Sequence, residues 1–350
     1  MKKNLGLFFC LILILMFIFN VILSINVFAA NKINFDELEN YILPNSSKNI
    51  VIEADLYNLS RYQIDTARNE IYARHGYIFK NENYAEYFAG KPWYKKNPKF
   101  KESQLSNIEE KNIQFLYSYS ARLSNNFRKI SETQCSIDLN GDGIKDIVKL
   151  DCHMGEDQYK LTINDKTVSG SGDNLDGIMY ITDIDKKDKY KEIAITESGP
   201  SNDNMTSFYY YDGSRVVFMG KVQGGEYSIK INGTGIFSTK TRGLILQTWF
   251  YTDEYKLSSA HKLLHIPAKY RKMNTIVTVK KQLELQKSPA DSTAVLTLQV
   301  GEKVVLTDTD NVKWCAVETV NGQKGWFSTA DLFETNSFPE DYFEGLCMAD

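Results

Sequence analysis

Apolar residues in the first third of the chain recur every three or four positions, which is the spacing of one face of an α-helix. Ser60 and Gln63 form a capping box before the first of these segments. Ser106 and Glu109 repeat that signal before a longer apolar stripe. The pattern therefore predicts a small helical module, which we place at residues 31–130.

The pattern then changes to short runs of β-branched and aromatic residues separated by turn residues. The Asp212-Gly213 pair between two such runs predicts a hairpin with a two-residue turn. Loops with an Asp or Asn before a strand recur at intervals of about 45 residues, around Asn140, Asp185 and Asn232. These features predict an antiparallel β repeat module at residues 131–275.

Short strands are predicted at 276–279, 304–306, 314–320 and 326–327, and Asn321-Gly322 marks the turn between the last two. This rhythm is typical of a small β-barrel, which we place at residues 276–335. The tail, residues 336–350, contains aromatic residues and is expected to dock on a neighbouring element. The chain is thus predicted to be a multi-domain α+β protein.

The first 30 residues have the pattern of an export signal. Lys2 and Lys3 precede a long apolar run that ends in Ala29 and Ala30. We expect a cleaved signal peptide because small residues stand where a peptidase needs them. The alternative is an uncleaved membrane anchor, because the run is longer than the roughly 7–15 residues of most leaders. Both interpretations place the rest of the chain outside the cell.

Composition restricts the class of partner. The chain has 41 basic and 44 acidic residues, and loss of Lys2 and Lys3 would leave 39 against 44, a net charge of −5. An acidic balance argues against general nucleic-acid binding, which usually needs a basic face. Cys135 and Cys152 flank a predicted hairpin and are expected either to pair or to remain thiols.

One segment of the helical module resembles a known family. Residues 67–79 read Ala-Arg-Asn-Glu-Ile-Tyr-Ala-Arg-His-Gly-Tyr-Ile-Phe, and Trp93-Tyr94 follows. This resembles the YARHG family of exported bacterial proteins, over roughly residues 56–123. The family has no assigned chemistry, and no acid, Ser or Cys is spaced to act with His75. We therefore expect a structural role for the motif residues, which are Tyr72, Ala73, Arg74, His75 and Gly76.

The central module carries the sharpest candidate chemistry, a loop with oxygen-bearing residues at alternate positions. Carboxylate, amide and carbonyl oxygens are the ligands that calcium prefers. The loop resembles the calcium loop of FG-GAP repeats, the strand-loop-strand units of integrin-type propellers. The alternative is a turn rich in Asp and Asn with no metal. The predicted calcium ligands are the side chains of Asp138, Asn140, Asp142 and Asp146 and the carbonyl of Ile144.

Three repeat units are fewer than the four to eight blades of a closed propeller, so we expect propeller-like blades without a closed ring. The second loop contains Asp183, Asp185 and Asp188, but its acidic residues no longer alternate. Whether that loop binds metal stays open. His261 and His265 have the spacing of a metal pair on a helix, although no Glu follows the first His.

The last module resembles bacterial Src-homology-3-like domains, which often attach exported proteins to the cell wall. The resemblance rests on Gly301 to Val304, Trp314 and Gly325-Trp326-Phe327. Aromatic residues line the peptide groove of such barrels, so Trp314 and Trp326 are candidate ligand contacts, with a core position as the alternative.

A local cluster of lysines in the helical module is a second candidate surface. Lys95 and Lys96 lie at its centre among aromatic residues, and anionic wall polymers would suit its charge. The alternative is a solvated loop whose aromatic residues belong to the core.

These features predict an exported, non-enzymatic protein that binds the cell envelope, with peptidoglycan or another wall polymer as ligand and calcium as a structural ion. The sequence contains no Gly-x-Ser-x-Gly, His-Glu-x-x-His or phosphate-loop motif. The alternatives are the sensory or structural ectodomain of a membrane-anchored protein and a cell-wall hydrolase. The sequence does not specify the oligomeric state.

Overall fold

The computed structural model describes residues 35, 40–152, 157–199, 203–333 and 338–348. The predicted leader lies outside these residues. Two compact units are distinguished. The large unit comprises the described residues of Asp36–Met273 with Asp308–Lys313 and Leu346–Asp350, and the small unit is formed mainly by Asn274–Thr307 and Trp314–Gly345. The helical and central β modules therefore share one unit, and the predicted boundary near residue 130 does not separate two units.

The helices of the large unit begin where their caps were predicted. Ser60 Oγ accepts a hydrogen bond from the Gln63 amide, and Ser106 does the same for Glu109. Both predicted capping boxes and helix starts are confirmed. The core of the helical part is formed mainly by buried apolar residues of the two long helices that begin at these caps. The helical elements are η1 Glu53–Leu56, α3 Arg61–Arg74, α4 Glu82–Ala89, η2 Glu102–Gln104 and α5 Asn107–Asn126.

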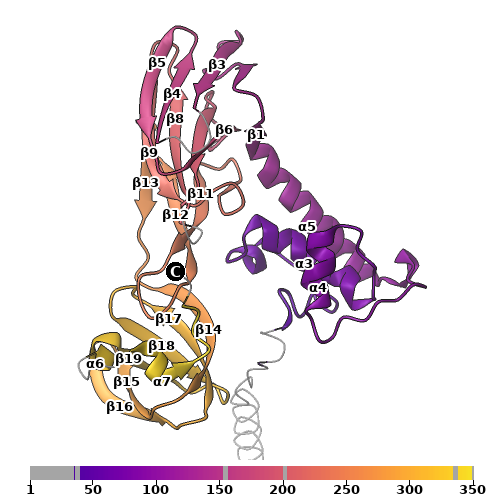
Figure 1. Ribbon diagram of the computed structural model, residues 1–350, viewed down its shortest axis with the longest axis vertical. Coiled ribbons are helices and arrows are strands. Elements are labelled where there is room, and N and C mark those ends of the chain that lie inside the picture. The colour runs from indigo at the N-terminus through magenta and orange to yellow at the C-terminus, as the bar shows by residue number, and fades with distance from the viewer. Residues whose placement is uncertain (1–34, 36–39, 153–156, 200–202, 334–337, 349–350) are drawn as a thin grey trace, which may run out of the picture. The chain divides into compact units, whose positions relative to one another are not determined.

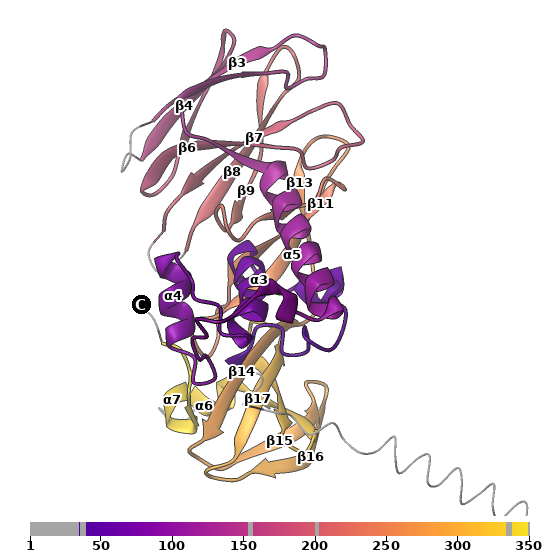
Figure 2. The ribbon, with the colours of Figure 1, turned by 90° about the vertical axis from the view of Figure 1, so that its right-hand side faces the viewer.

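The chain passes from α5 directly into a β region, as Figure 1 and Figure 2 show. The strands form three antiparallel sheets, each of which follows the chain order, and this confirms the predicted antiparallel β repeat. The first sheet contains β2 Gln134–Ile137, β3 Asp146–Asp151, β4 Gln158–Ile163 and β5 Lys166–Ser171. The second contains β6 Leu175–Thr182, β7 Glu192–Glu197, β8 Met205–Tyr211 and β9 Val216–Gln223, with β1 Phe127–Ile130 at its edge. The third contains β10 Lys230–Ile231, β11 Ile236–Arg242, β12 Phe250–Leu257 and β13 Leu263–Ile266.

The second sheet packs between the other two. Alternate residues of a strand face opposite sides of its sheet, and every residue of β7 is buried. Ile193 and Ile195 belong to the apolar core shared with the first sheet, whereas Ala194 belongs to the core shared with the third. The three sheets therefore stack in sequence order through two separate cores.

The three predicted repeat loops occupy equivalent positions, each between the first and second strands of its four-stranded meander. They also lie side by side. The Lys191 amide donates to the Leu139 carbonyl across 2.9 Å, and the Lys186 amide donates to the Gly233 carbonyl across 3.1 Å. The second loop thus lies between the first and the third.

The predicted hairpin at Asp212-Gly213 forms, but its loop is longer than expected. Tyr211 pairs with Val216, so four residues connect β8 and β9 instead of two. The Asp212 carboxylate accepts hydrogen bonds from the amides of Ser214 and Arg215. This side-chain capping closes the longer loop, and the sequence signal did not distinguish it from a two-residue turn.

The small unit contains one seven-stranded sheet in the order β16-β15-β19-β18-β17-β14-β20, and Figure 1 shows it curled. The predicted strands at 276–279, 304–306, 314–320 and 326–327 are confirmed, whereas β15 and β16 were missed. Part of the tail docks as expected, because Phe343 is buried and pairs with Val279. The elements are β14 Arg271–Val279, β15 Leu283–Ser288, β16 Asp291–Leu298, β17 Lys303–Thr309, β18 Trp314–Thr319, β19 Lys324–Ser328, α6 Thr329–Phe333, α7 Pro339–Tyr342 and β20 Phe343–Glu344.

Candidate functional site

The predicted calcium ligands lie on the loop that closes the hairpin of β2 and β3. The Asp138 carboxylate accepts hydrogen bonds from the amides of Gly141 and Gly143, at 2.8 and 3.0 Å. The two oxygens of Asp142 accept from the Ile144 amide and the Asn140 side chain, at 2.8 and 3.0 Å. The loop backbone is therefore held by its own Asp and Asn side chains.

The far end of this loop is buried. Asp146 is 4% exposed, and its carboxylate accepts from the Leu139 amide at 2.9 Å and from the Asn164 side chain at 2.8 Å. Ile144 has an exposed side chain. The carboxylates of Asp138, Asp142 and Asp146 do not form a group with ligand atoms within 4.8 Å of one another. The donor type suits calcium, but binding would require these side chains to move closer together.

Hydrogen bonds from the loop backbone stabilise the ionised carboxylate of Asp138. Desolvation acts to raise the pKa of Asp138, but the amides of Gly143 and Gly141 stabilise the carboxylate and lower that pKa overall. The loop therefore presents a carboxylate that stays ionised at neutral pH, as calcium binding requires.

Arg74 of the YARHG motif joins α3 to the segment that precedes η1. Its guanidinium pairs with Glu70, donates to the Leu43 carbonyl at 2.8 Å, and contacts the hydroxyls of Ser46 and Ser47. Glu70 is fully buried and also accepts from the Ile42 amide at 2.7 Å. The pair is therefore an internal ion pair with several hydrogen bonds, which is a structural arrangement.

His75 has an acidic partner that the sequence reasoning missed. Its Nε2 lies 2.9 Å from Oε1 of Glu109, the residue that completes the capping box of α5. Desolvation acts to raise the pKa of Glu109, but hydrogen bonds from Ser106 and His75 lower it overall. The capping box identified Glu109 as important, but nothing local in the sequence joined it to a residue 34 positions away.

Gly76 ends α3 in a conformation that favours glycine. Its φ is +82°, and an added Cβ would lie 2.4 Å from the Lys95 carbonyl oxygen. The Asn97 amide donates to the Gly76 carbonyl at 2.8 Å. Tyr72 packs against Tyr77 and Phe100, and Ala73 is buried. Each residue of the motif thus has a packing or hydrogen-bonding role within the helical part.

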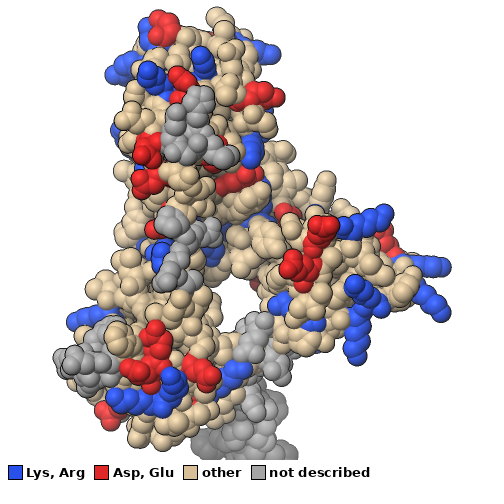
Figure 3. Space-filling model, in the orientation of Figure 1, with Lys and Arg blue, Asp and Glu red and all other residues tan. Residues whose placement is uncertain are grey.

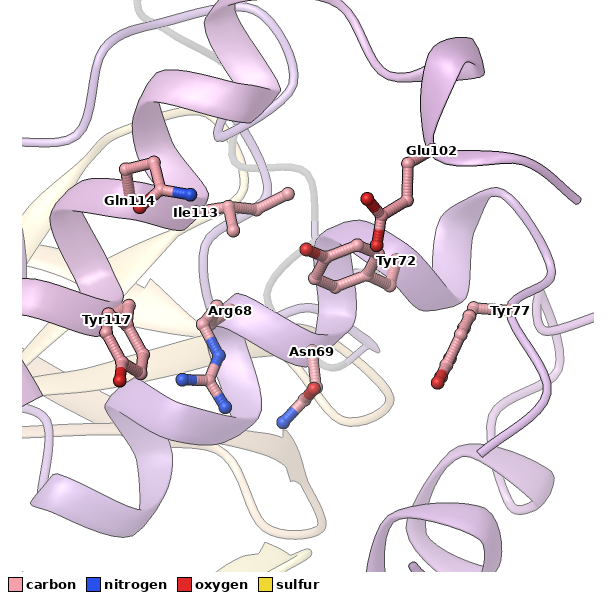
Figure 4. A pocket seen from close by; sticks show the side chains of 8 residues that line it. All are labelled: Arg68, Asn69, Tyr72, Tyr77, Glu102, Ile113, Gln114 and Tyr117. Atoms are coloured by element: carbon pink, nitrogen blue, oxygen red, sulfur yellow. The ribbon is translucent and has the colours of Figure 1, made fainter. Parts of the chain in front are cut away.

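A polar pocket of about 390 Å³ lies beside the motif. Figure 4 shows that side chains from α3 face side chains from α5 across it, with Tyr77 and Glu102 at one end. Burial, followed by the nearby Glu102 charge, raises the pKa of Tyr72. The pocket therefore offers phenol hydroxyls, side-chain amides, one basic residue and one acidic residue. Its lining residues are Arg68, Asn69, Tyr72, Tyr77, Glu102, Ile113, Gln114 and Tyr117.

A larger cavity of about 700 Å³ lies where α3 meets the second and third sheets. Arg61 pairs with Glu226 at 3.2 Å and stacks over the Tyr227 ring, which fixes the start of α3 there. Lys240 lines the cavity and donates to the Asn58 carbonyl at 2.6 Å, and burial lowers its pKa to about 8. The cavity combines aromatic walls, from Tyr62, Tyr87 and Tyr227, with a few charged groups, as small-molecule sites do.

The lysine cluster is an exposed loop over packed aromatic residues. Lys95 and Lys96 are exposed, and no carboxylate among the described residues pairs with either. Trp93 stacks on Tyr41 at 4.8 Å, and Tyr94 donates to the Tyr77 carbonyl at 2.7 Å. Figure 3 shows basic side chains projecting from the helical region on the face drawn. The aromatic residues are thus structural, and the lysines remain available to an anion.

The two candidate tryptophans of the small unit share one face of the β18–β19 hairpin. Trp314 pairs with Ser328 and Trp326 pairs with Ala316, so strand alternation places both on the same side. The neighbours on the other side, Cys315, Val317 and Phe327, are buried in the core. Both tryptophans are half-buried. Both tryptophans therefore lie on the face of the hairpin opposite these three residues, a face that also includes the buried Ala316 and Ser328.

The structure separates the two candidate metal histidines. His261 lies in the turn between β12 and β13, and His265 lies on β13 with its Nε2 2.9 Å from Asp253. The helix that would place both histidines on one face does not form, so their spacing of four residues does not bring them to one metal site. Cys135 and Cys152 are not joined by a disulfide in the structure.

Export was predicted from residues 1–30, which lie outside the described residues. In the part of the chain that the structure describes, no helix has the length and apolar character needed to cross a membrane.

Comparison with known families covers two parts of the chain. No curated protein matches the chain, and no solved structure does. Neither of the two family matches includes the three stacked sheets, so the resemblance of that region to FG-GAP repeats stays a prediction. Residues 39–121 match the YARHG domain and residues 276–330 match the variant SH3 domain, and the chain therefore carries one domain of each kind.

Proposed function

We propose that this chain is an exported, non-enzymatic protein that binds the cell envelope through its variant SH3 domain, with peptidoglycan or another wall polymer as ligand. The supporting observation is the aromatic face formed by Trp314 and Trp326 on the β18–β19 hairpin. Half-buried aromatic rings can stack on a peptide or sugar with the part that remains accessible and provide much of the contact area.

The exposed lysines of the helical part support a secondary contact with anionic wall polymers. Lys95 and Lys96 project from a loop whose backbone is fixed by its packed aromatic residues. A fixed array of unpaired ammonium groups attracts a polyanion, and the attraction weakens as salt screens it. This contact would add to the aromatic contact without replacing it.

Calcium bound to the loop between β2 and β3 is the remaining part of the proposal. It rests on the oxygen-only donor set and on the alternate spacing of Asp138, Asn140 and Asp142. Binding would draw the carboxylates together and stiffen the loop against its neighbour. Calcium titration of leader-free protein tests this, with Asp142→Ala as the variant and the exposed Asp165→Ala as control. No change in melting temperature with calcium or with chelator would remove the ion from the proposal.

Retention on purified sacculi tests the main proposal. We expect leader-free protein to sediment with sacculi, and Trp326→Ala and Trp314→Ala to lower retention about tenfold or more. Val300→Ala is a suitable control because Val300 is an exposed apolar residue of the same unit. Equal retention of all variants would exclude the aromatic face as the binding site. Release of soluble fragments from sacculi would exclude a non-enzymatic role.

The contact made by Lys95 and Lys96 can be recognised by its dependence on salt concentration. We expect Lys95→Ala with Lys96→Ala to weaken retention at low salt and to have little effect at high salt, because screening removes the same attraction. Lys111→Ala is the control, since Lys111 is also exposed in the helical part.

A specific observation favours a second function, that of a sensory ectodomain. The cavity of about 700 Å³ beside α3 has the size and mixed lining of a small-molecule site. A thermal-shift screen of soluble wall fragments would test it. We expect a stabilising fragment to lose its effect in Tyr227→Ala but to retain it in Trp326→Ala, which separates this cavity from the barrel face.

A further inference from the structure

Three side chains from two sheets meet beside the second repeat loop. Asp188 belongs to the loop between β6 and β7, Glu192 is the first residue of β7, and His261 belongs to the turn between β12 and β13. One ligand atom from each lies within 4.8 Å of the other two, and among the described residues this is the group of three that could hold a metal. The cluster is distinct from the predicted calcium loop.

Glu192 supplies an independent indication of a ligand. Its side chain is fully buried, and its Oε2 accepts hydrogen bonds from the Ile184 amide at 3.0 Å and the Thr182 hydroxyl at 3.3 Å. Its Oε1 is buried and has no hydrogen-bond partner among the described residues. A buried carboxylate oxygen without a partner is unfavourable, so a positive group at this position would be strongly stabilised.

His261 also has a buried polar atom without a hydrogen-bond partner in the part of the chain that the structure describes. Its Nδ1 is also buried without a hydrogen-bond partner among the described residues. The ring stacks on Tyr210, with centroids 4.5 Å apart, and meets the edge of Tyr190 at 4.7 Å. These two aromatic rings fix the orientation of the imidazole. A ring held in this way presents its nitrogen at little further cost in conformational entropy, as metal-ligating histidines do.

The local charge also favours a cation. Asp183 has a further buried carboxylate oxygen with no partner among the described residues. One divalent ion among Asp188, Glu192 and His261 would give a partner to the buried Glu192 oxygen and would lie beside the further carboxylate of Asp183.

The donor set indicates the class of ion. One imidazole nitrogen with two carboxylates suits zinc and neighbouring transition metals, whereas calcium prefers oxygen ligands alone. Ligand atoms about 2.1 Å from a tetrahedral zinc ion lie about 3.4 Å from one another. The observed ligand atoms lie within 4.8 Å of one another, so binding would draw the three side chains closer together.

We propose that Asp188, Glu192 and His261 bind one divalent transition-metal ion of the zinc type, which joins the second sheet to the third. Three protein ligands leave a further position for water. The site lies between the loop of one repeat unit and a turn of the next. It does not depend on the proposed envelope-binding function, and it makes the packing of these two sheets sensitive to metal.

Equilibrium dialysis of metal-stripped, leader-free protein against zinc tests the proposal, with bound metal measured by mass spectrometry. We expect the wild-type chain to retain one equivalent of zinc, and His261→Gln to bind at least about tenfold more weakly. His265→Gln is the matched control, because His265 lies four residues away and is bonded to Asp253 instead. Cobalt should give the absorption bands of a bound ion in wild type and in His265→Gln, but not in His261→Gln.

Two further variants keep the test decisive if one fails to fold. Glu192→Gln removes the buried charge, and Asp188→Asn alters a half-buried side chain. Each should lose tight zinc binding, whereas Asp142→Ala in the calcium loop should retain it. No zinc retained by wild type, or equal binding by wild type and both variants, would overturn the proposal. Binding lost in His265→Gln but kept in His261→Gln would place the ion elsewhere and overturn it as well.

Discussion

His75 Nε2 and Glu109 Oε1 lie 2.9 Å apart and connect the end of α3 to the first turn of α5. Glu109 also accepts from the Ser106 amide as part of the capping box. One carboxylate therefore caps its own helix and ties down the end of another. This arrangement explains how a motif on α3 can specify the fold of the whole helical part.

Replacing either partner should destabilise the helical part. We expect His75→Gln and Glu109→Gln each to lower the free energy of unfolding by about 1–3 kcal/mol, because each removes the pairing of the imidazole with a carboxylate at a half-buried or buried position. A double-mutant cycle in urea at neutral pH measures the coupling, which should be about 1 kcal/mol. Additive effects of the two substitutions would contradict a direct interaction.

The same carboxylate should contribute to acid sensitivity. The pKa of Glu109 is lower in the folded state than its usual value, so the folded state binds fewer protons there. Its contribution is therefore complete above the unfolded pKa, about 4.3, and is lost as pH falls through the folded value. We expect the stability difference between wild type and Glu109→Gln to shrink between about pH 5 and about pH 3. A constant difference would assign the effect to packing alone.

Arg74 should be far more important for stability than its neighbour Arg68. Arg74→Ala leaves the buried Glu70 carboxylate without its cation, which costs about 3–5 kcal/mol. Arg68→Ala removes a looser contact with Asp65 at 3.9 Å and should cost about 1 kcal/mol or less. Chemical denaturation of the two variants measures the contrast. Similar losses would show that helix propensity, rather than the ion pair, sets the effect.

The contact between the first and second repeat loops can be isolated with two glycines. Gly141 and Gly143 have φ values of +68° and +83°, so alanine is strained at both. Only Gly141 lies against the second loop, where an added Cβ would be 2.6 Å from the Lys189 carbonyl oxygen. We expect Gly143→Ala to cost about 1 kcal/mol and Gly141→Ala at least about 1 kcal/mol more. Equal costs would indicate that the loops are not tightly packed.

Lys230 should make the large unit more stable as the solution becomes alkaline. Its ammonium group is buried and donates to the carbonyls of Leu56 and Tyr57, and burial lowers its pKa to about 7. The unfolded chain therefore binds more protons than the folded one between about pH 7 and about pH 10. Stability should rise with pH across that interval.

Substitution separates this contribution from other alkaline titrations. We expect wild type to gain roughly 2 kcal/mol more than Lys230→Met between about pH 7 and about pH 9, measured by urea unfolding. Lys111→Met is the control, because Lys111 is exposed and its loss should leave the pH slope unchanged. Parallel slopes for all three proteins would contradict the buried titration.

Local signals in the sequence were sufficient for much of the architecture. The capping boxes at Ser60 and Ser106 located both helix starts, and the recurrence of Asn140, Asp185 and Asn232 located three equivalent loops. These signals work because capping and turn formation involve residues only a few positions apart. The strands β15 and β16 were missed because they have little apolar alternation of their own and are specified by pairing within the sheet.

The sequence by itself determined the starts of α3 and α5, the order of the repeat loops and the oxygen-rich loop, since each depends on neighbouring residues. Only the tertiary structure paired His75 with Glu109, placed Trp314 beside Trp326 on one face, and brought His261 to Asp188 and Glu192. These contacts join segments between 12 and 73 positions apart. Their formation depends on how helices and sheets pack around shared cores, and packing is a property of the folded chain that no single segment encodes.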